Sequence, residues 1–306
     1  MTIARKAPAR LRSLSLEITG RCQLTCPSLC YAASGPTRGH GTMGDDDWVR
    51  TIDQSVALGA EEVQLIGGEP TLHPGFVSIA RHAVDSGLRV RVYSNLFRIS
   101  EDHWQLLEHQ AVRLATTYHS SIAAEHDEVT GRQGSHTATR ANITQAVRRG
   151  IALKVAVLDA CDHQRAERAR TELEALGVRD IHVGRVRAVG NAAAGTALPS
   201  TAELCGRCGD QRAVVLPNGD VAVCEIGRFL TAGNVQSASL ASVLSSPQWA
   251  AASASIPRRT GPTACHPDCQ PSNSDSCDPG KNDPCDPMGY APPAPGSPVA
   301  AVPALV

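Results

Sequence analysis

Residues 17–32 read EITGRCQLTCPSLCYA and follow an alternating run, residues 14–19, that is typical of a β-strand. Cys22, Cys26 and Cys30 therefore stand in a loop directly after a strand end. Three thiolates can hold three irons of a 4Fe-4S cube and leave the fourth iron open to a small chelating ligand. A tetrahedral zinc loop completed by His40, or a set of reduced core thiols, is the alternative for the same stretch. The cluster interpretation indicates chemistry rather than storage.

Short β-rich runs alternate with longer helical runs over the first 190 residues. We expect strands at residues 14–19, 62–66, 88–93, 112–118, 151–158 and 180–186, and helices at residues 45–58, 76–86, 101–109, 139–149 and 164–176. Apolar strands that alternate with helices favour a parallel sheet covered by helices. The sequence therefore predicts an α/β protein with a partial (β/α)6 TIM-like barrel at residues 10–190. Ligands of such sheets gather at the carboxyl ends of the strands.

Composition limits the classes of partner. The 306 residues carry 29 basic and 30 acidic side chains, so nothing in the charge balance favours nucleic acid or a membrane. Eleven cysteines, an odd number, favour metal ligation over a closed set of disulfides. No apolar run is long enough for a signal peptide or a membrane span. We therefore predict a cytoplasmic protein.

Residues 66–74, IGGEPTLHP, follow the second predicted strand. Gly67 and Gly68 let the backbone approach a ligand closely, and Glu69 places a carboxylate at the strand end. Alone such a triplet is an ordinary turn. One β/α unit after a three-cysteine loop, it resembles the radical S-adenosylmethionine (SAM) superfamily, in which a GGEP segment contacts the methionine amino group of SAM. The usual loop is CxxxCxxC, whereas here the second gap has three residues. The aromatic Tyr31 after the third cysteine also fits the resemblance as a cofactor contact.

Three further strand ends carry candidate site residues. By resemblance, Ser94 and Asn95 in VYSNL lie near the ribose or carboxylate of SAM, although an ordinary turn explains them equally. By the same resemblance, the segment HVGRVR is expected to bring Val183 and Gly184 toward the adenine of SAM. Cys161, just after the fifth strand, can give a hydrogen atom to a substrate radical, or is an inert core thiol. His119 occupies the place where relatives carry an acid, and we expect a solvated, noncatalytic histidine there.

A second cysteine-rich module is expected at residues 200–286. Cys205 and Cys208 precede two short strands that flank a Pro-Asn-Gly-Asp turn, a strong hairpin signal, and Cys224 closes the second strand. The spacing of Cys208, Gly219 and Cys224 resembles the SPASM and twitch extensions of peptide-modifying radical enzymes. This resemblance implies one auxiliary 4Fe-4S cluster, with Cys265 as a further ligand, and a zinc ribbon is the alternative. Cys269, Cys277 and Cys285 do not match the family spacing, and the Pro- and Ala-rich tail 287–306 is predicted to be disordered.

The resemblance implies an enzyme that cleaves SAM reductively to a 5′-deoxyadenosyl radical, which takes hydrogen from a substrate. The expected substrate is a ribosomally made peptide to be crosslinked or epimerised, and a small metabolite or a protein side chain is the alternative. A noncatalytic metal-binding or cluster-binding protein would leave the GGEP segment without a role. An electron donor such as flavodoxin or ferredoxin is also implied. Because little sequence precedes the first strand, we expect a leader peptide to be bound by the barrel rim, the C-terminal module or a separate leader-peptide-binding protein.

Overall fold

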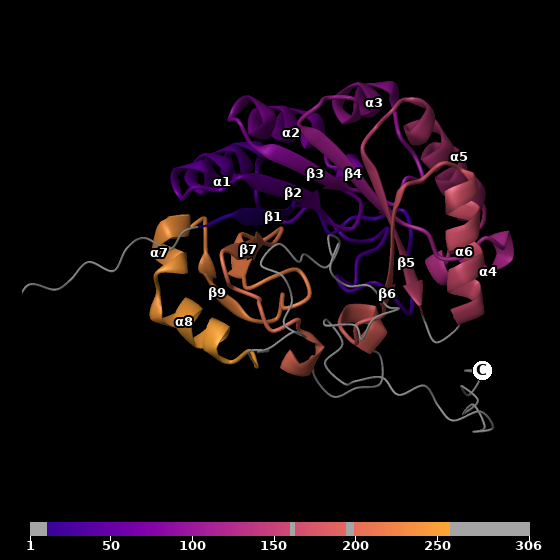
Figure 1. Ribbon diagram of the computed structural model, residues 1–306. Helices are drawn as coiled ribbons and strands as arrows, with labels where there is room; N and C mark the ends of the chain where they lie inside the picture. The colour runs from indigo at the N-terminus through magenta and orange to yellow at the C-terminus, as the bar shows by residue number, and fades with distance from the viewer. Residues whose placement is uncertain (1–10, 160–162, 194–198, 258–306) are drawn as a thin grey trace, which may run out of the picture.

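The computed structural model describes residues 11–159, 163–193 and 199–257 (Figure 1). The described strands form one nine-stranded sheet in the order β6-β5-β4-β3-β2-β1-β7-β8-β9. Two predicted site residues, Cys161 and Cys265, lie outside the described residues. The same holds for Cys269, Cys277 and Cys285 and for the predicted tail 287–306.

Six parallel strands and their helices form the first part of the chain, as predicted. The strands are β1 (Ser13–Glu17), β2 (Glu62–Ile66), β3 (Arg89–Tyr93), β4 (Val112–Thr117), β5 (Leu153–Asp159) and β6 (Asp180–Arg185). The helices are α1 (Asp45–Ala57), α2 (Phe76–Asp85), α3 (Glu101–Leu107), α4 (Ala123–Thr130), α5 (Ser135–Arg148) and α6 (His163–Ala175). The sheet curves without closing, and most of these helices cover its outer face (Figure 1). The partial barrel is therefore confirmed.

Helix α4 lies in a stretch where the sequence predicts no helix, and α5 begins four residues before the predicted start. Asp127 explains the earlier start of α5. Its carboxylate, which lies on α4, accepts hydrogen bonds from the backbone N–H groups of Gly134 (2.6 Å) and His136 (2.8 Å) and from the Ser135 hydroxyl (2.9 Å). It therefore caps the start of α5 from the preceding helix, an arrangement that no local N-cap residue signals.

Alternation along the strands separates an apolar outer face from a polar interior. On β1, Leu14 and Leu16 are fully buried in the core, together with Trp48 and Ile52 of α1. The residues between them have polar partners inside the barrel, where the Ser15 hydroxyl hydrogen-bonds the Glu225 carboxylate. Since successive side chains of a strand point to opposite faces, this pattern leaves the barrel interior to polar groups and ligands.

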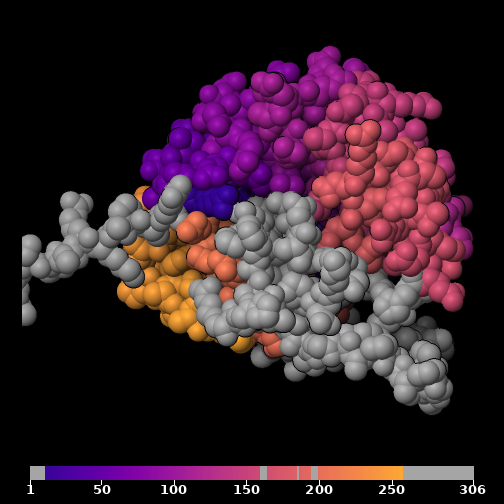
Figure 2. Space-filling model, viewed as in Figure 1, coloured from indigo at the N-terminus to yellow at the C-terminus, as the bar shows by residue number. Residues whose placement is uncertain are grey.

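The C-terminal residues extend the same sheet. Strand β7 (Arg212–Val215) pairs in parallel with β1, and β8 (Asp220–Ala222) returns antiparallel to β7, which confirms the predicted hairpin. Gly219 supplies the positive φ of 84° that the turn requires. Strand β9 (Thr231–Asn234) and helices α7 (Leu240–Leu244) and α8 (Pro247–Ala254) follow. In Figure 2 the orange C-terminal elements meet the barrel beside the indigo residues of β1.

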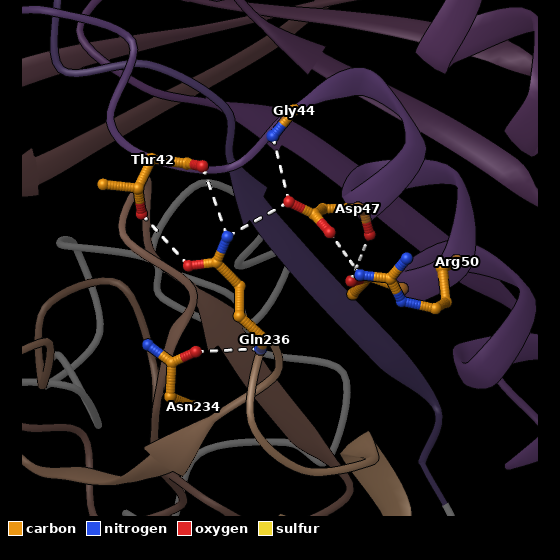
Figure 3. A network of polar contacts seen from close by, with 7 residues as sticks. Thr42, Gly44, Asp47, Arg50, Asn234 and Gln236 are labelled. Atoms are coloured by element: carbon orange, nitrogen blue, oxygen red, sulfur yellow. Dashed lines mark hydrogen bonds and ion pairs between the residues drawn. The ribbon is translucent and has the colours of Figure 1, made fainter.

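Polar contacts and a shared core attach this extension to the barrel. Gln236 donates from Nε2 to the Asp47 carboxylate (3.1 Å) and to the Thr42 carbonyl (3.2 Å), and it accepts from the Thr42 hydroxyl (Figure 3). Buried side chains of β7, β8, α7 and α8 belong to the same hydrophobic cluster as those of β1. The described part of the C-terminal region is thus held to the barrel by a common core and by polar contacts. No helix in the three described ranges is both long and apolar enough to cross a bilayer.

Candidate functional site

A cavity of about 270 Å³ lies at the carboxyl ends of the parallel strands. Both described sets of cysteines line it: Cys22, Cys26 and Cys30 from the loop after β1, and Cys205, Cys208 and Cys224 from the C-terminal region. The strand-end residues that line it include Ile66, Gly67, Gly68, Tyr93, Asn95, Thr117, His119, Leu158 and Gly184. The barrel and the C-terminal extension therefore share one site.

A single helical turn accommodates the extra residue in the first cysteine loop. The N–H groups of Leu29 and Cys30 both donate to the Cys26 carbonyl, at 3.3 and 3.2 Å. Residues four apart in such a turn lie on the same side, so a three-residue gap can present both thiols to one cavity. Cys26 has a positive φ of 38°, and its N–H donates to the Thr130 carbonyl at the end of α4 (3.0 Å). Helix α4 thereby fixes the loop.

The thiols of this loop lie in an environment that suits a cationic cluster. Burial raises the pKa of the Cys22 thiol to about 12. Burial, and then the neighbouring Cys30 and Cys22, raise the pKa of the Cys26 thiol to about 12. Without a positive charge beside them, the Cys22 and Cys26 thiols stay protonated at neutral pH, whereas bound metal favours the thiolates. The Cys22 sulfur also accepts from the Leu24 N–H (3.4 Å) and the Asn95 amide (3.5 Å). The donor set therefore fits a 4Fe-4S cluster held by three thiolates.

The zinc alternative for the first cysteine loop finds no support in the described residues. His40 does not line the cavity, because its Nδ1 lies 2.9 Å from the Thr19 hydroxyl and its ring packs against His73. Within the described ranges, no three Cys, His, Asp or Glu side chains are arranged around a single metal ion. A cluster spreads its ligands over several irons and needs no such convergence.

Gly67 and Gly68 line the cavity, and they also let β2 approach the cysteine loop. A Cβ on Gly67 would lie 2.4 Å from the Thr19 carbonyl oxygen, and one on Gly68 would lie 2.5 Å from that of Arg21. The N–H groups of Gly68 and Glu69 donate to these two carbonyls, each at 2.8 Å. Both positions therefore require glycine because the backbone of Thr19 and Arg21 lies too close to leave room for a Cβ atom.

Glu69 is fully buried and does not line the cavity. Its carboxylate accepts from the backbone N–H of Asn95 (2.7 Å), the N–H of Thr71 (3.2 Å) and the Thr71 hydroxyl (2.7 Å). Burial raises the pKa of Glu69, and these hydrogen bonds oppose that shift. The carboxylate thus positions Asn95, which does reach the cavity.

The other predicted residues divide between the cavity and the core. Tyr31 lines the cavity, and burial followed by the nearby Glu17 raises the pKa of its hydroxyl. Ser94 is buried behind the cavity wall, where its hydroxyl accepts from the Leu96 N–H (3.1 Å). Gly184 lines the cavity, whereas Val183 packs against the hydrophobic core.

The described C-terminal cysteines form a compact group of sulfurs. The Cys208 sulfur lies 3.0 Å from that of Cys224 and 4.0 Å from that of Cys205. The hairpin produces this contact, since β8 returns along β7 and delivers Cys224 beside Cys208. Hydrogen bonding with Cys205 and Cys224, and then burial, raise the pKa of the Cys208 thiol. As in the first loop, bound metal would relieve this effect.

A row of histidines at the cavity wall differs from the expectation of a solvated His119. His119 and His126 line the cavity, and their ring centroids lie 5.3 Å apart. Burial, followed by the charge of a neighbouring histidine, lowers the pKa of His119 to about 3 and that of His126 to about 4. The Nδ1 atom of His119 is buried without a hydrogen-bond partner among the described residues. His119 is therefore neutral and can hydrogen-bond a bound molecule.

Sequence reasoning missed several residues of the cavity wall, among them Gln64, His182 and Glu225. Gln64 and His182 occupy inward positions on β2 and β6. The polar members of alternating strands would have been a signal for them. Glu225 follows Cys224, and only the pairing of β7 with β1 brings it into the barrel.

The open parallel barrel carries a three-thiol loop after its first strand, and a second set of thiols lines the same cavity. This arrangement is typical of iron–sulfur enzymes that generate radicals. The family model of the radical SAM superfamily matches residues 16–158, and that of the SPASM iron–sulfur cluster-binding domain matches residues 205–270. The chain therefore contains a radical SAM domain followed by a SPASM domain.

The chain spans about a third of the length of two curated relatives that it matches. PqqA peptide cyclase of Rhodopseudomonas palustris is 30% identical over 122 residues, which are 40% of this chain and 32% of that protein. AdoMet-dependent heme synthase of Methanosarcina barkeri is 31% identical over 133 residues, 43% of this chain and 38% of that protein. The crystal structure of Streptococcus suis SuiB bound to precursor peptide SuiA gives a TM-score of 0.68 at 13% identity, covering 79% of this chain and 66% of SuiB. This last similarity concerns the fold.

Proposed function

We propose that this protein is a radical SAM enzyme that modifies a ribosomally made peptide. The observation that carries the proposal is one cavity lined by both sets of cysteines at the carboxyl ends of the barrel strands. When bound, the reduced cluster and SAM together supply a radical that removes a hydrogen atom from carbon. A cluster-storage protein would have no need for a cavity of strand-end residues beside its thiols.

Cys22, Cys26 and Cys30 are the proposed ligands of the SAM-binding cluster. Their loop is held from three sides. Helix α4 lies on one side, and the segment after β2 lies on another, where the Glu69 N–H donates to the Arg21 carbonyl (2.8 Å). On the third side the Asn191 N–H donates to the Cys30 carbonyl (2.8 Å). Rigid support of this kind fixes where the open iron would face. Asn95 orients the Cys22 thiol through its amide.

Gly67, Gly68, Glu69, Ser94, Asn95 and Tyr31 are the proposed SAM-binding residues. Glu69 carries a carboxylate beside the cavity wall, where it would balance the charge of the methionine ammonium group. Its present partners are the N–H groups of Asn95 and Thr71, so it also fixes the strand end that SAM would contact. Ser94 acts through its contact with Leu96.

We further propose that the barrel at residues 10–190 and a SPASM-like module at residues 200–286 hold separate clusters. Cys205, Cys208 and Cys224 supply ligands to the auxiliary cluster, and Cys265 is the proposed further ligand. Cys161 is the proposed hydrogen-atom donor, because in sequence it follows the carboxyl end of β5 and therefore the end of the barrel that carries the cysteine-lined cavity.

The names of two similar proteins support a peptide substrate: PqqA peptide cyclase, and SuiB bound to the precursor peptide SuiA. The heme synthase relative keeps a small-molecule substrate as the alternative. His119, neutral and at the cavity wall, is placed to bind a substrate amide. A flavodoxin or ferredoxin is the proposed electron donor, and a separate leader-binding protein is a proposed partner.

A labelled-substrate experiment tests the proposal. The reduced, anaerobically reconstituted protein is incubated with SAM and with a candidate precursor peptide that carries deuterium at each Cα or side-chain carbon in turn. Transfer of deuterium into 5′-deoxyadenosine, with a matching mass change in the peptide, would support peptide modification. Cleavage of SAM without transfer from any peptide, but with transfer from a small metabolite, would replace the peptide with the alternative substrate.

A further inference from the structure

A second and larger cavity, of about 770 Å³, opens at the amino ends of the barrel strands, and we call it the lower cavity. It is lined by the first residues of successive strands, such as Ser13 of β1, Glu62 of β2 and Arg89 of β3. None of the described cysteines lines it. All the barrel strands run in the same direction, so their amino ends meet at one end of the barrel and their carboxyl ends at the other. The lower cavity and the cysteine-lined cavity therefore lie at opposite ends of the barrel.

Basic side chains dominate the lower cavity. Seven basic residues line it, six of them arginine, against three acidic ones. Over the whole chain the two kinds are nearly equal, 29 against 30, so the excess is local. An open cavity with one dominant sign of charge concentrates ions of the opposite sign.

The acidic side chains in the lower cavity already have partners. Glu62 pairs with Arg91 through two contacts of 3.3 and 3.4 Å, and Asp180 pairs with Lys154 at 3.5 Å. Asp210 pairs at 2.9 Å with Arg207, which does not line the cavity. The three carboxylates are therefore engaged, and they are too few to neutralise the seven cations around them.

Two of the arginines are available to a ligand. Arg113 lies within β4, and Arg179 lies directly before β6. Both are exposed to solvent in the lower cavity, and neither has an ion pair with another described residue. Two more, Arg12 and Arg89, approach the same carboxylate, that of Glu61, at 3.4 and 3.6 Å.

Several of the cations are also buried. Arg91, Lys154 and Arg212 expose only 6%, 4% and 8% of their surface. Burying like charges around one space is unfavourable unless opposite charges compensate for it. A bound anion would add to that compensation, and guanidinium groups bind phosphate and carboxylate oxygens in pairs.

We propose that the lower cavity binds a compact polyanion whose charge lies on phosphate or carboxylate oxygens. Its volume lies within the range of about 300–1,000 Å³ that is usual for small-molecule sites. No aromatic residue of the described chain lines it, so it offers no surface for stacking a nucleobase. Its remaining walls include aliphatic side chains, such as Val147 and Ile151, and the polar Gln211. The ligand is therefore recognised by its charge, at a site separate from the cysteines.

Calorimetry on the full-length, cluster-loaded protein tests this proposal. Sodium tripolyphosphate and sodium citrate are titrated separately under anaerobic conditions, and the iron content is measured before and after. The variants are Arg113→Gln and Arg179→Gln. The matched control is Arg81→Gln, because Arg81 is an exposed arginine of α2 outside the cavity with no ion pair to another described residue.

We expect saturable one-to-one binding of at least one probe, weakened about fivefold or more by each cavity variant and less than about twofold by Arg81→Gln. Preference for tripolyphosphate would identify phosphate as the recognised group, and preference for citrate would identify carboxylate. The proposal is overturned by the absence of saturable binding, or by equal losses in all three variants. Tighter binding of an acidic hexapeptide than of either probe would also overturn it, since the ligand would then be an extended chain.

Discussion

The contact between the GGE segment and the cysteine loop makes Gly68→Ala an informative substitution. The new Cβ would lie 2.5 Å from the Arg21 carbonyl oxygen, 2.7 Å from its carbon and 2.9 Å from the Cys22 Cβ. Two of these atoms are backbone, so β2 and the loop must move apart. That movement also strains the hydrogen bonds from Gly68 to Thr19 and from Glu69 to Arg21, each 2.8 Å long.

Overpacking of this kind costs about 1–3 kcal/mol, and the two weakened hydrogen bonds together cost about 1 kcal/mol. We therefore expect the free energy of unfolding to fall by about 2–4 kcal/mol, which corresponds to a Tm lower by roughly 5–15 °C for a domain of this size. Less iron should be retained, because Cys22 moves. Circular dichroism during heating and iron analysis measure the two effects.

Gly35→Ala is the matched control for Gly68→Ala. Gly35 lies in the same loop region, has no left-handed backbone, and has open space where the added Cβ would stand, with no atom within 4 Å of it. The control should leave both Tm and iron content near the wild-type values. If Gly68→Ala behaved like Gly35→Ala, the close approach of β2 to the loop would not support the site.

Three further predictions concern the carboxylate, the auxiliary thiols and the histidines. Glu69→Gln should weaken SAM binding, measured by calorimetry, about tenfold without loss of iron. The reason is that an amide cannot accept hydrogen bonds from both the Asn95 and the Thr71 N–H groups, as the carboxylate does. Unchanged affinity would show that the GGEP segment is only a turn. Replacing Cys208 and Cys224 with Ala should remove one iron–sulfur signal and abolish substrate turnover while SAM cleavage partly survives, whereas stoichiometric zinc in anaerobically purified wild-type protein would point to a zinc domain. His119 and His126 are neutral in the folded protein, whereas an unfolded histidine takes up a proton below a pH of about 6.5, so acidification favours unfolding. The free energy of unfolding of the metal-free protein, measured with urea, should therefore fall by about 1 kcal/mol per histidine between pH 6.5 and 5.5. The His119→Gln variant should show a smaller fall.

Local patterns predicted most of the barrel and the hairpin. Period-two strands alternate with helices, and Pro217 to Asp220 form a turn with its own chemistry, so both were readable over short stretches. The start of α5 was not, because Asp127 caps it from another helix. The pairing of β7 with β1 was also missed, since the apolar residues of β7 do not specify which strand they join.

The candidate site was predictable where it depends on the order of residues along the chain, and not where it depends on tertiary contacts. The cysteines and glycines follow strand ends, where a linear sequence places them correctly. The side-chain direction of Glu69 depends on the Asn95 N–H, and the neutrality of His119 depends on burial beside α4. The charge of the lower cavity arises from single residues on many strands, which only the curvature of the sheet brings together.

The most direct test of radical SAM chemistry in this chain is the amount of 5′-deoxyadenosine formed per chain after dithionite reduction with SAM. Wild-type protein should form it. The variant with Cys22, Cys26 and Cys30 replaced by Ala should form none, while losing about four irons and keeping the auxiliary cluster. Cleavage by that variant, or loss of all iron from it, would contradict the assignment of the two cysteine sets to two separate clusters.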